Sequence, residues 1–307
     1  MVLPLWVKGL SDRPWPWVTT VLILINFAVF LGTHTQIDQE SRDVSRVELP
    51  MLLISAAHPE IDPPADVKPL IDSFAKDNKP LWDGIRSGKQ PPSDEWDREM
   101  RDWGPMQARH ELEDLAIRWK QAQPDSVLQN YAFYPYKPTL TSFLTANFLH
   151  GGWLHLIGNM WFLWLAGAMM ENVWGPWIYT GFYLLAGVGG LVAHGTTYPH
   201  SVMPLLGASG AIAGLIGGFL VRFPEAKIDL VAILFIRVIR FEWPAYIVLP
   251  LWIALQMVWG FFVRNGGGVA YLAHVGGFMF GVAMAVALRY MGLERPLPES
   301  QEPQFAS

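Results

Sequence analysis

Six long apolar stretches constrain this chain more than any other feature of its sequence. A helix needs roughly 20 mostly apolar residues to cross a bilayer, with about 17–25 tolerated. Because lipid offers no partners to the backbone, each spanning segment must bond its own polar groups, which favours helices. We therefore expect an all-α, polytopic membrane protein with six transmembrane helices. The stretches are Trp17–Thr33, Trp153–Met170, Trp177–His194, Leu205–Val221, Ala245–Val263 and Val269–Leu288.

The composition agrees with a membrane protein and excludes several other classes. Hydrophobic residues make up 51% of the 307 residues and charged residues only 16%, which is too apolar for a soluble domain of this length. No basic tract indicates a nucleic-acid partner, and the absence of cysteine excludes disulfides and a cysteine nucleophile. The first stretch follows Lys8 and Arg13, as in a signal peptide. No small-x-small cleavage site follows it, so we expect an uncleaved anchor.

The basic residues of the short loops predict the orientation in the membrane. They are concentrated at the N-terminus, between the fourth and fifth stretches, and after the sixth, whereas the link between the third and fourth has none. With an even number of spans, both termini are expected in the cytoplasm. The expected parts are the N-terminus with helix one (1–34), a partly helical extracytoplasmic loop insertion (35–139), a core with helices two to six (140–290) and a cytoplasmic tail (291–307).

Two polar segments between the predicted spans need separate interpretations. In the insertion, Trp96–Gln121 has the pattern of an amphipathic or solvated helix, while Met51–Ala57 is apolar but too short to span a membrane. Between the fourth and fifth spans, Lys227–Trp243 mixes apolar residues with arginines and a glutamate. We interpret this segment as an interfacial strip on the cytoplasmic surface.

Six polar side chains stand out within the predicted spans, where burial in lipid is energetically costly. Asn26 in helix one and Gln256 in helix five are interpreted as amides that bond across helices as packing contacts. The other four are His155 and Asn159 in helix two, Ser209 in helix four and His274 in helix six. These three helices all run from outside to inside. At a rise of 1.5 Å per residue, His155, Ser209 and His274 fall within roughly one helical turn of each other in depth, near the outer surface. Asn159 lies on the same helix face as His155, one turn deeper. The shared depth predicts a single site.

This combination favours nucleophilic chemistry at Ser209. A serine hydroxyl is a poor nucleophile unless an adjacent base takes its proton, and His274 can act as that base. Backbone N–H groups at the start of helix four, together with His155 and Asn159, are suited to hold an oxyanion. No Asp or Glu lies at this depth, so the expectation is a dyad.

Glycines around these residues support close packing of helices four and six. Gly207 and Gly210 flank Ser209 and allow a tight entry into helix four. The spacing Gly277-x-x-x-Gly281 gives helix six a small-residue face, and helix four has a similar one. The simpler alternative is that the glycines only pack and that Ser209 is a filler hydroxyl.

Three blocks occur in order on helices two, four and six: His150-Gly-Gly-Trp-Leu-His155-Leu-Ile-Gly-Asn159, Gly207-Ala-Ser-Gly210 and Ala273-His274-Val-Gly-Gly277. Together they resemble the rhomboid family of intramembrane serine proteases, over about Leu140–Arg289 plus the first helix. The resemblance implies that Ser209 is the nucleophile and His274 the general base. It also implies that His155, Asn159 and the Ser209 backbone N–H hold the oxyanion.

The resemblance further implies a six-helix rhomboid-like bundle that cleaves transmembrane segments of other membrane proteins within the lipid bilayer, without a cofactor or metal. His150 and Glu171 match positions that organise the first loop and the inner end of helix two, and for both we expect a purely structural role. Some members have an aromatic residue four positions after the nucleophile, packed on the base; here that position is Ala213. The insertion is also much longer than the first loop of compact members.

Two other classes of function stay open. One is a proteolytically silent relative that binds membrane helices, although such relatives typically lose the serine or the histidine. The other is a transporter or metal-binding protein that uses the histidines outside the insertion. The expected location is a bacterial inner membrane, and the physiological substrate and oligomeric state are not predicted. The histidines of that alternative are His150, His155, His194, His200 and His274.

Overall fold

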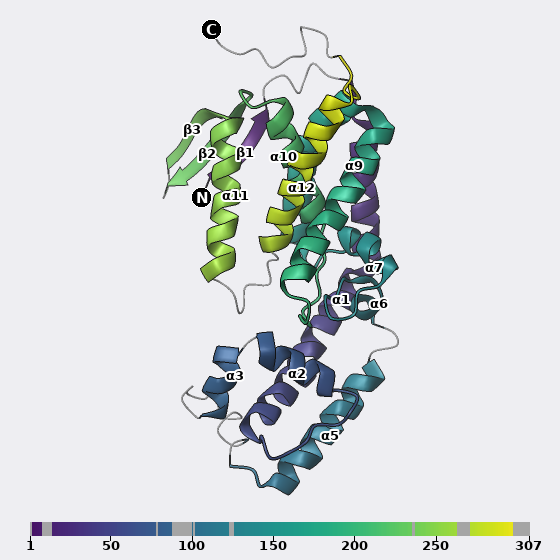
Figure 1. Cartoon of the computed structure of the whole chain (residues 1–307), viewed down its shortest axis with the longest axis vertical. Helices are drawn as coiled ribbons and strands as arrows, with labels where there is room; N and C mark the ends of the chain where they lie inside the picture. The colour runs from purple at the N-terminus through teal and green to yellow at the C-terminus, as the bar shows by residue number, and fades with distance from the viewer. Residues whose placement is uncertain are drawn as a thin grey trace. The chain divides into compact units, whose positions relative to one another are not determined.

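The computed structural model describes residues 2–7, 14–77, 79–87, 100, 102–122, 126–234, 237–262 and 271–296, and most of them are helical (Figure 1). Contacts divide the chain into two compact units. The core unit comprises Met1–Leu31, Phe143–His194 and Leu206–Ser307, and the insertion unit comprises Gly32–Ser142 and Gly195–Leu205. The loop between the third and fourth predicted spans therefore folds with the insertion.

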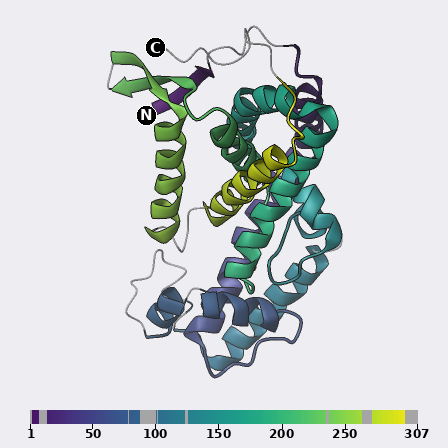
Figure 2. The same ribbon diagram turned by 45° about the horizontal axis from the view of Figure 1, so that its top comes forward.

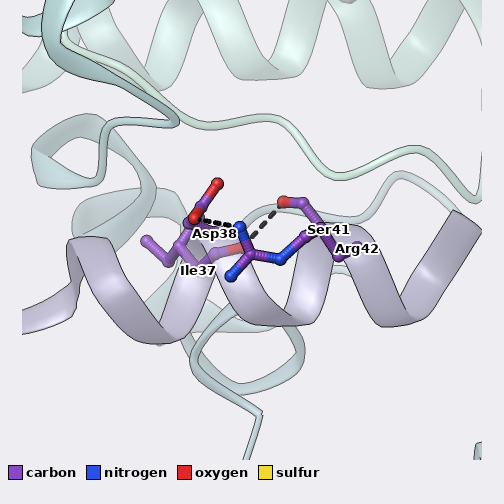
Figure 3. A network of polar contacts seen from close by, with 4 residues as sticks. All are labelled: Ile37, Asp38, Ser41 and Arg42. Atoms are coloured by element: carbon purple, nitrogen blue, oxygen red, sulfur yellow. Dashed lines mark hydrogen bonds and ion pairs between the residues drawn. The ribbon is translucent and has the colours of Figure 1, made fainter.

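Helix α1, Trp17–Ala57, is much longer than the predicted span that ends at Thr33. Polar contacts one turn apart support its continuation. The Ser41 hydroxyl donates to the Ile37 carbonyl at 2.7 Å, and the Arg42 guanidinium bonds the Asp38 carboxylate at 2.6 Å (Figure 3). The apolar segment Met51–Ala57, predicted as a separate short piece, forms the last turns of this helix.

A buried carboxylate from another helix caps the beginning of α1. Glu171 accepts hydrogen bonds from the backbone N–H groups of Val18 and Thr19, at 2.9 and 2.8 Å, and from the Thr19 hydroxyl at 2.8 Å. These amides belong to the first turn, where a helix leaves its N–H groups without intrahelical partners and favours negative charge. The structural role expected of Glu171 is thus to fix the start of α1.

The second and third predicted spans form one long helical stretch with a sharp break. It consists of α8 (Trp153–Phe162), a π-helical turn η2 (Leu163–Gly167) and α9 (Ala168–Thr197). Gly175 interrupts the helical backbone with φ 69° and ψ 173°, and Pro176 follows it. A side chain at Gly175 would be strained at this φ and would collide with the Arg295 guanidinium.

Helices α10 (Ser209–Arg222) and α12 (Tyr271–Tyr290) pack through their glycines, and Figure 2 shows the two ribbons side by side. A Cβ added to Gly277 would collide with the carbonyl oxygen of Gly210, and one added to Gly281 with that of Gly214. The two backbones therefore touch directly, as small-residue faces permit in membrane helices.

A three-stranded antiparallel sheet departs from the expectation of an all-α chain. Strands β2 (Lys227–Leu234) and β3 (Arg237–Pro244) form a hairpin, and β1 (Val2–Val7) pairs with the other edge of β2. The segment predicted as an interfacial strip forms these two strands, apart from residues 235–236, which lie outside the described part; its place at the membrane surface stays a prediction. In β2, Lys227 and Asp229 alternate with the buried Ile228 and Leu230, which is the period of a strand with one apolar face. Helix α11, Ala245–Phe262, follows directly.

The insertion unit has its own apolar core. Met51 and Ile54 of α1 are fully buried and pack with residues of the shorter helices, including Leu112. The predicted helix Trp96–Gln121 corresponds to α5, which begins at Pro105, a residue favoured in the first turn. Residues 96–99 and 101 lie outside the described part. The shorter helices of this unit are α2 (Lys68–Asp77), α3 (Lys79–Arg86), α5 (Pro105–Ala122) and α6 (Val127–Tyr131). Helix α7 (Leu140–Thr145) crosses the boundary at Ser142, and the 3₁₀ turn η1 (Ala146–Phe148) belongs to the core unit.

The loop Gly195–Leu205 is bonded to the insertion through its backbone. Phe133 and Leu205 exchange two hydrogen bonds, at 3.0 and 2.8 Å, and the Tyr136 N–H donates to the Ser201 carbonyl at 3.3 Å. The Phe133 ring is buried and lies against Gly195. This loop is thus an integral part of the insertion unit.

Within the described residues, three helical stretches are long and apolar enough to cross a membrane: Trp17–Ala57, Trp153–Thr197 and Tyr271–Tyr290. Helix α10 and the part of α11 from Ala245 to Leu255 are apolar but shorter. The chain is therefore an integral membrane protein. The count of six spans stays a prediction.

Candidate active site

Ser209 is the first residue of α10, and the turn before it depends on glycine. Gly207 has a φ of +125°, where residues with a Cβ are strained, and its N–H donates to the Ala146 carbonyl at 2.8 Å. Ala208 is the N-cap and makes no side-chain capping bond. Because the first N–H groups of a helix have no intrahelical acceptor, the backbone around Ser209 can donate to an anion.

His274 of α12 meets Ser209 directly. Its Nε2 lies 2.8 Å from the Ser209 Oγ, which is hydrogen-bond distance. The two residues are far apart in sequence, and the close approach of Gly210 and Gly277 brings their helices together. The structure therefore brings this serine hydroxyl and this histidine ring within hydrogen-bond distance.

His155 and Asn159 lie one turn apart on α8 and both face Gly207. A Cβ built on Gly207 would lie 2.8 Å from the Nε2 and Cε1 atoms of His155 and 3.6 Å from the Nδ2 of Asn159. Since Gly207 is two residues before Ser209, the three blocks predicted from sequence converge on this turn. Two side-chain donors and the start of α10 thus surround it.

His150 holds the Asn159 amide. Its Nε2 lies 3.0 Å from the Asn159 Nδ2, and its Nδ1 lies 3.3 Å from the Phe148 carbonyl oxygen. An amide nitrogen can only donate, so Nε2 accepts and Nδ1 carries the proton of a neutral ring. The side chain is fully buried, and its ring meets that of His155 edge-on at 5.1 Å. The structural role expected of His150 thus includes orienting a site residue.

The neutral state of His150 predicts a pH-dependent stability. Burial, and to a lesser degree the nearby His155, lower the pKa of His150 to about 4. Between pH 6.5 and 4 the unfolded chain therefore binds more protons at this position, and the free energy of unfolding falls as the pH falls. The expected loss is about 2 kcal/mol at pH 5.

This loss is measurable by thermal unfolding in detergent at pH 7 and pH 5. In His150→Gln, whose amide oxygen can still accept from Asn159, the difference between the two pH values is expected to be smaller. An equal difference in both proteins would contradict a neutral, buried His150.

The packing of the His274 ring was not predicted from the sequence. Ala213, at the position where some rhomboids have an aromatic residue, is fully buried. The ring instead lies against Trp252 of α11, with centroids 6.3 Å apart and planes at 23°, and against the edge of Tyr271, at 6.5 Å and 84°. Trp252 is one aromatic residue among many in an apolar helix, so no local signal distinguishes it.

Two histidines of the metal-binding alternative have other partners in the described part of the chain. Among the residues that the structure describes, no group of three or more His, Cys, Asp or Glu side chains is placed to bind a metal ion. His274 bonds Ser209, and His150 bonds Asn159. The described contacts therefore give no support to the metal-binding alternative.

The fold and the site together define a helical membrane protein with a serine–histidine pair shared by two packed helices. The model of the rhomboid domain matches residues 137–291, half of the chain. The chain therefore belongs to the rhomboid family.

Curated relatives agree with this assignment. Rhomboid protein 1, mitochondrial, from Saccharomyces cerevisiae is 31% identical over 172 residues, covering 53% of this chain and 45% of that protein. Rhomboid protease GluP from Bacillus subtilis is 33% identical over 146 residues, covering 47% of this chain and 25% of that protein. Rhomboid-type serine protease 2 from Emericella nidulans is 30% identical over 146 residues, with coverage of 48% and 26%. The chain thus spans less than half the length of these relatives.

Proposed function

We propose that the chain is an intramembrane serine endopeptidase in which Ser209 is the nucleophile and His274 the general base. The observation that carries this proposal is the 2.8 Å contact between the Ser209 Oγ and the His274 Nε2. Membership of the rhomboid family and the similarity to two relatives named as proteases support it.

In the proposed reaction, His274 Nε2 takes the hydroxyl proton as the Ser209 Oγ attacks the carbonyl carbon of the scissile peptide bond. The resulting oxyanion is held by the Ser209 backbone N–H and by His155 and Asn159, whose nearness to Gly207 supports this role. The imidazolium then gives its proton to the leaving amine, and an acyl-enzyme remains. Water, deprotonated by His274, hydrolyses the acyl-enzyme and regenerates Ser209.

The proposed substrates are membrane proteins with a span that can unwind near the outer surface and a small residue before the cut, as the family resemblance implies. We propose six spans with both termini in the cytoplasm, the insertion 35–139 outside, and a bacterial inner membrane as location. The basic loops support this orientation. Gly207, Gly210, Gly277 and Gly281 act as supporting residues because they permit the turn and the helix contact.

Labelling with a fluorophosphonate tests the nucleophile independently of the unknown substrate. In liposomes, the wild-type protein is expected to be labelled once, at Ser209, and to cleave a tagged single-span substrate. Ser209→Ala should be neither labelled nor active. Ser201→Ala, which changes another half-buried serine, should behave like the wild type. Labelling of Ser209→Ala at the wild-type rate would refute the proposal.

A further inference from the structure

Trp252 supports the histidine ring from a helix that carries neither member of the pair. The residues on α10 that follow Ser209 at the α12 contact include the glycines Gly210, Gly214 and Gly217. None of them offers a surface large enough to fix an imidazole plane. The Trp252 indole of α11 lies near the His274 ring, with its plane inclined by only 23° to the imidazole and the centroids 6.3 Å apart, within the range of interacting aromatic pairs.

The second aromatic contact of His274 comes from its own helix. Tyr271 lies three residues before His274 on α12, so the two side chains share a helix face and move together with that helix. Trp252 belongs to α11, so its contact relates the orientation of the ring to a third helix, besides α12 itself and α10, which carries the hydrogen-bonded Ser209. The position of α11 therefore bears on whether Nε2 points at Ser209.

Trp252 also lines an apolar cavity of about 480 Å³ in the core unit. The cavity is walled by side chains of α8, η2, α10, the β2–β3 hairpin and α11, including Phe162, Phe219 and Leu255. The indole thus lines the cavity and also contacts the His274 ring. Truncating it would enlarge the cavity and remove the ring contact together, whereas truncating Leu255 would only enlarge the cavity.

We propose that Trp252 is a positioning residue for His274, holding the imidazole plane so that Nε2 points at the Ser209 hydroxyl. This inference rests on the proposed function. According to this inference, α11 affects catalysis through Trp252 and the His274 ring, without touching the scissile bond. A positioning role predicts a loss in the rate of proton transfer, and hence in kcat, with little change in KM.

The test compares Trp252→Ala, Trp252→Phe and Leu255→Ala in liposomes. Trp252→Ala is expected to lower both kcat and the rate of fluorophosphonate labelling at Ser209 by about 10-fold, the size of one aromatic pair contact, with KM within about twofold. Trp252→Phe, which keeps a ring, should recover most of both rates. Leu255→Ala should keep both rates near wild type.

Thermal unfolding of each variant separates positioning from general damage. The inference is overturned if Trp252→Ala keeps the wild-type kcat and labelling rate, or if Leu255→Ala loses as much as Trp252→Ala. It is also overturned if Phe at position 252 gives no recovery while unfolding is unchanged. These outcomes leave the proposed function standing, because the assignment of the nucleophile fails when Ser209→Ala is labelled or active, and neither result depends on Trp252.

Discussion

Removing Ser209 or His274 alone is expected to lower kcat/KM for a single-span substrate as much as removing both. The loss should be on the order of 10⁴-fold or more in each single variant. The physical reason is that neither group has a function in bond cleavage without the other: the hydroxyl needs the base, and the base needs the proton of the hydroxyl. The 2.8 Å contact between the Ser209 Oγ and the His274 Nε2 couples the two side chains, so we expect them to act as one catalytic unit.

The measurement is cleavage of a tagged substrate in liposomes by Ser209→Ala, His274→Ala and the double variant. All three should unfold at temperatures close to that of the wild type, since both side chains are only partly buried. A double variant that loses the product of the two single effects would show that the residues act independently. That result would exclude a dyad.

Adding one methyl group at Gly277 is expected to damage both stability and activity. The new Cβ would collide with the Gly210 carbonyl oxygen, which is backbone and cannot rotate away. Helices α10 and α12 must then separate, at a cost of about 1–3 kcal/mol or more for an overpacked contact. Because α10 carries Ser209 and α12 carries His274, the same separation lengthens their hydrogen bond, and activity should fall beyond the loss of folded protein.

Gly181→Ala is the matched control for Gly277→Ala. It adds the same methyl group within a membrane helix, α9, but nothing lies within 4 Å of the new atom. Thermal unfolding and the activity per folded molecule should both stay near wild type in this control. Equal behaviour of the two variants would mean that the glycine contact does not set the distance between α10 and α12.

The site was more predictable from sequence than its surroundings. Polar residues in apolar helices are conspicuous, and their equal depth indicated that Ser209, His274 and His155 meet. The structure brings Ser209 and His274 together and places His155 and Asn159 against Gly207. The hydrogen bond from Asn159 to His150 could not be derived, because it depends on how the loop before α8 folds back.

Other features were missed because apolar side chains look alike in a membrane sequence. Trp252 carries no mark that separates it from other aromatic residues of the spans, so its contact with His274 appears only in three dimensions. The hairpin of β2 and β3 does show the alternation of a strand, but its mixture of charged and apolar residues also suits an interfacial segment. The pairing of β2 with β1 joins segments that are distant in sequence, so neither the strand-like alternation nor the mixed composition predicts it.

The bonds between Phe133 and the loop Gly195–Leu205 bear on how such a protein can be divided or recombined. Residues 35–139 are not a detachable module, because deleting them would strip the loop of its backbone partners and of the Phe133 ring. Leu205, the end of that loop, precedes Ser209 by only four positions. A chimaera that exchanges the insertion with a relative must therefore carry the loop along with it, and the natural exchange unit is discontinuous in sequence.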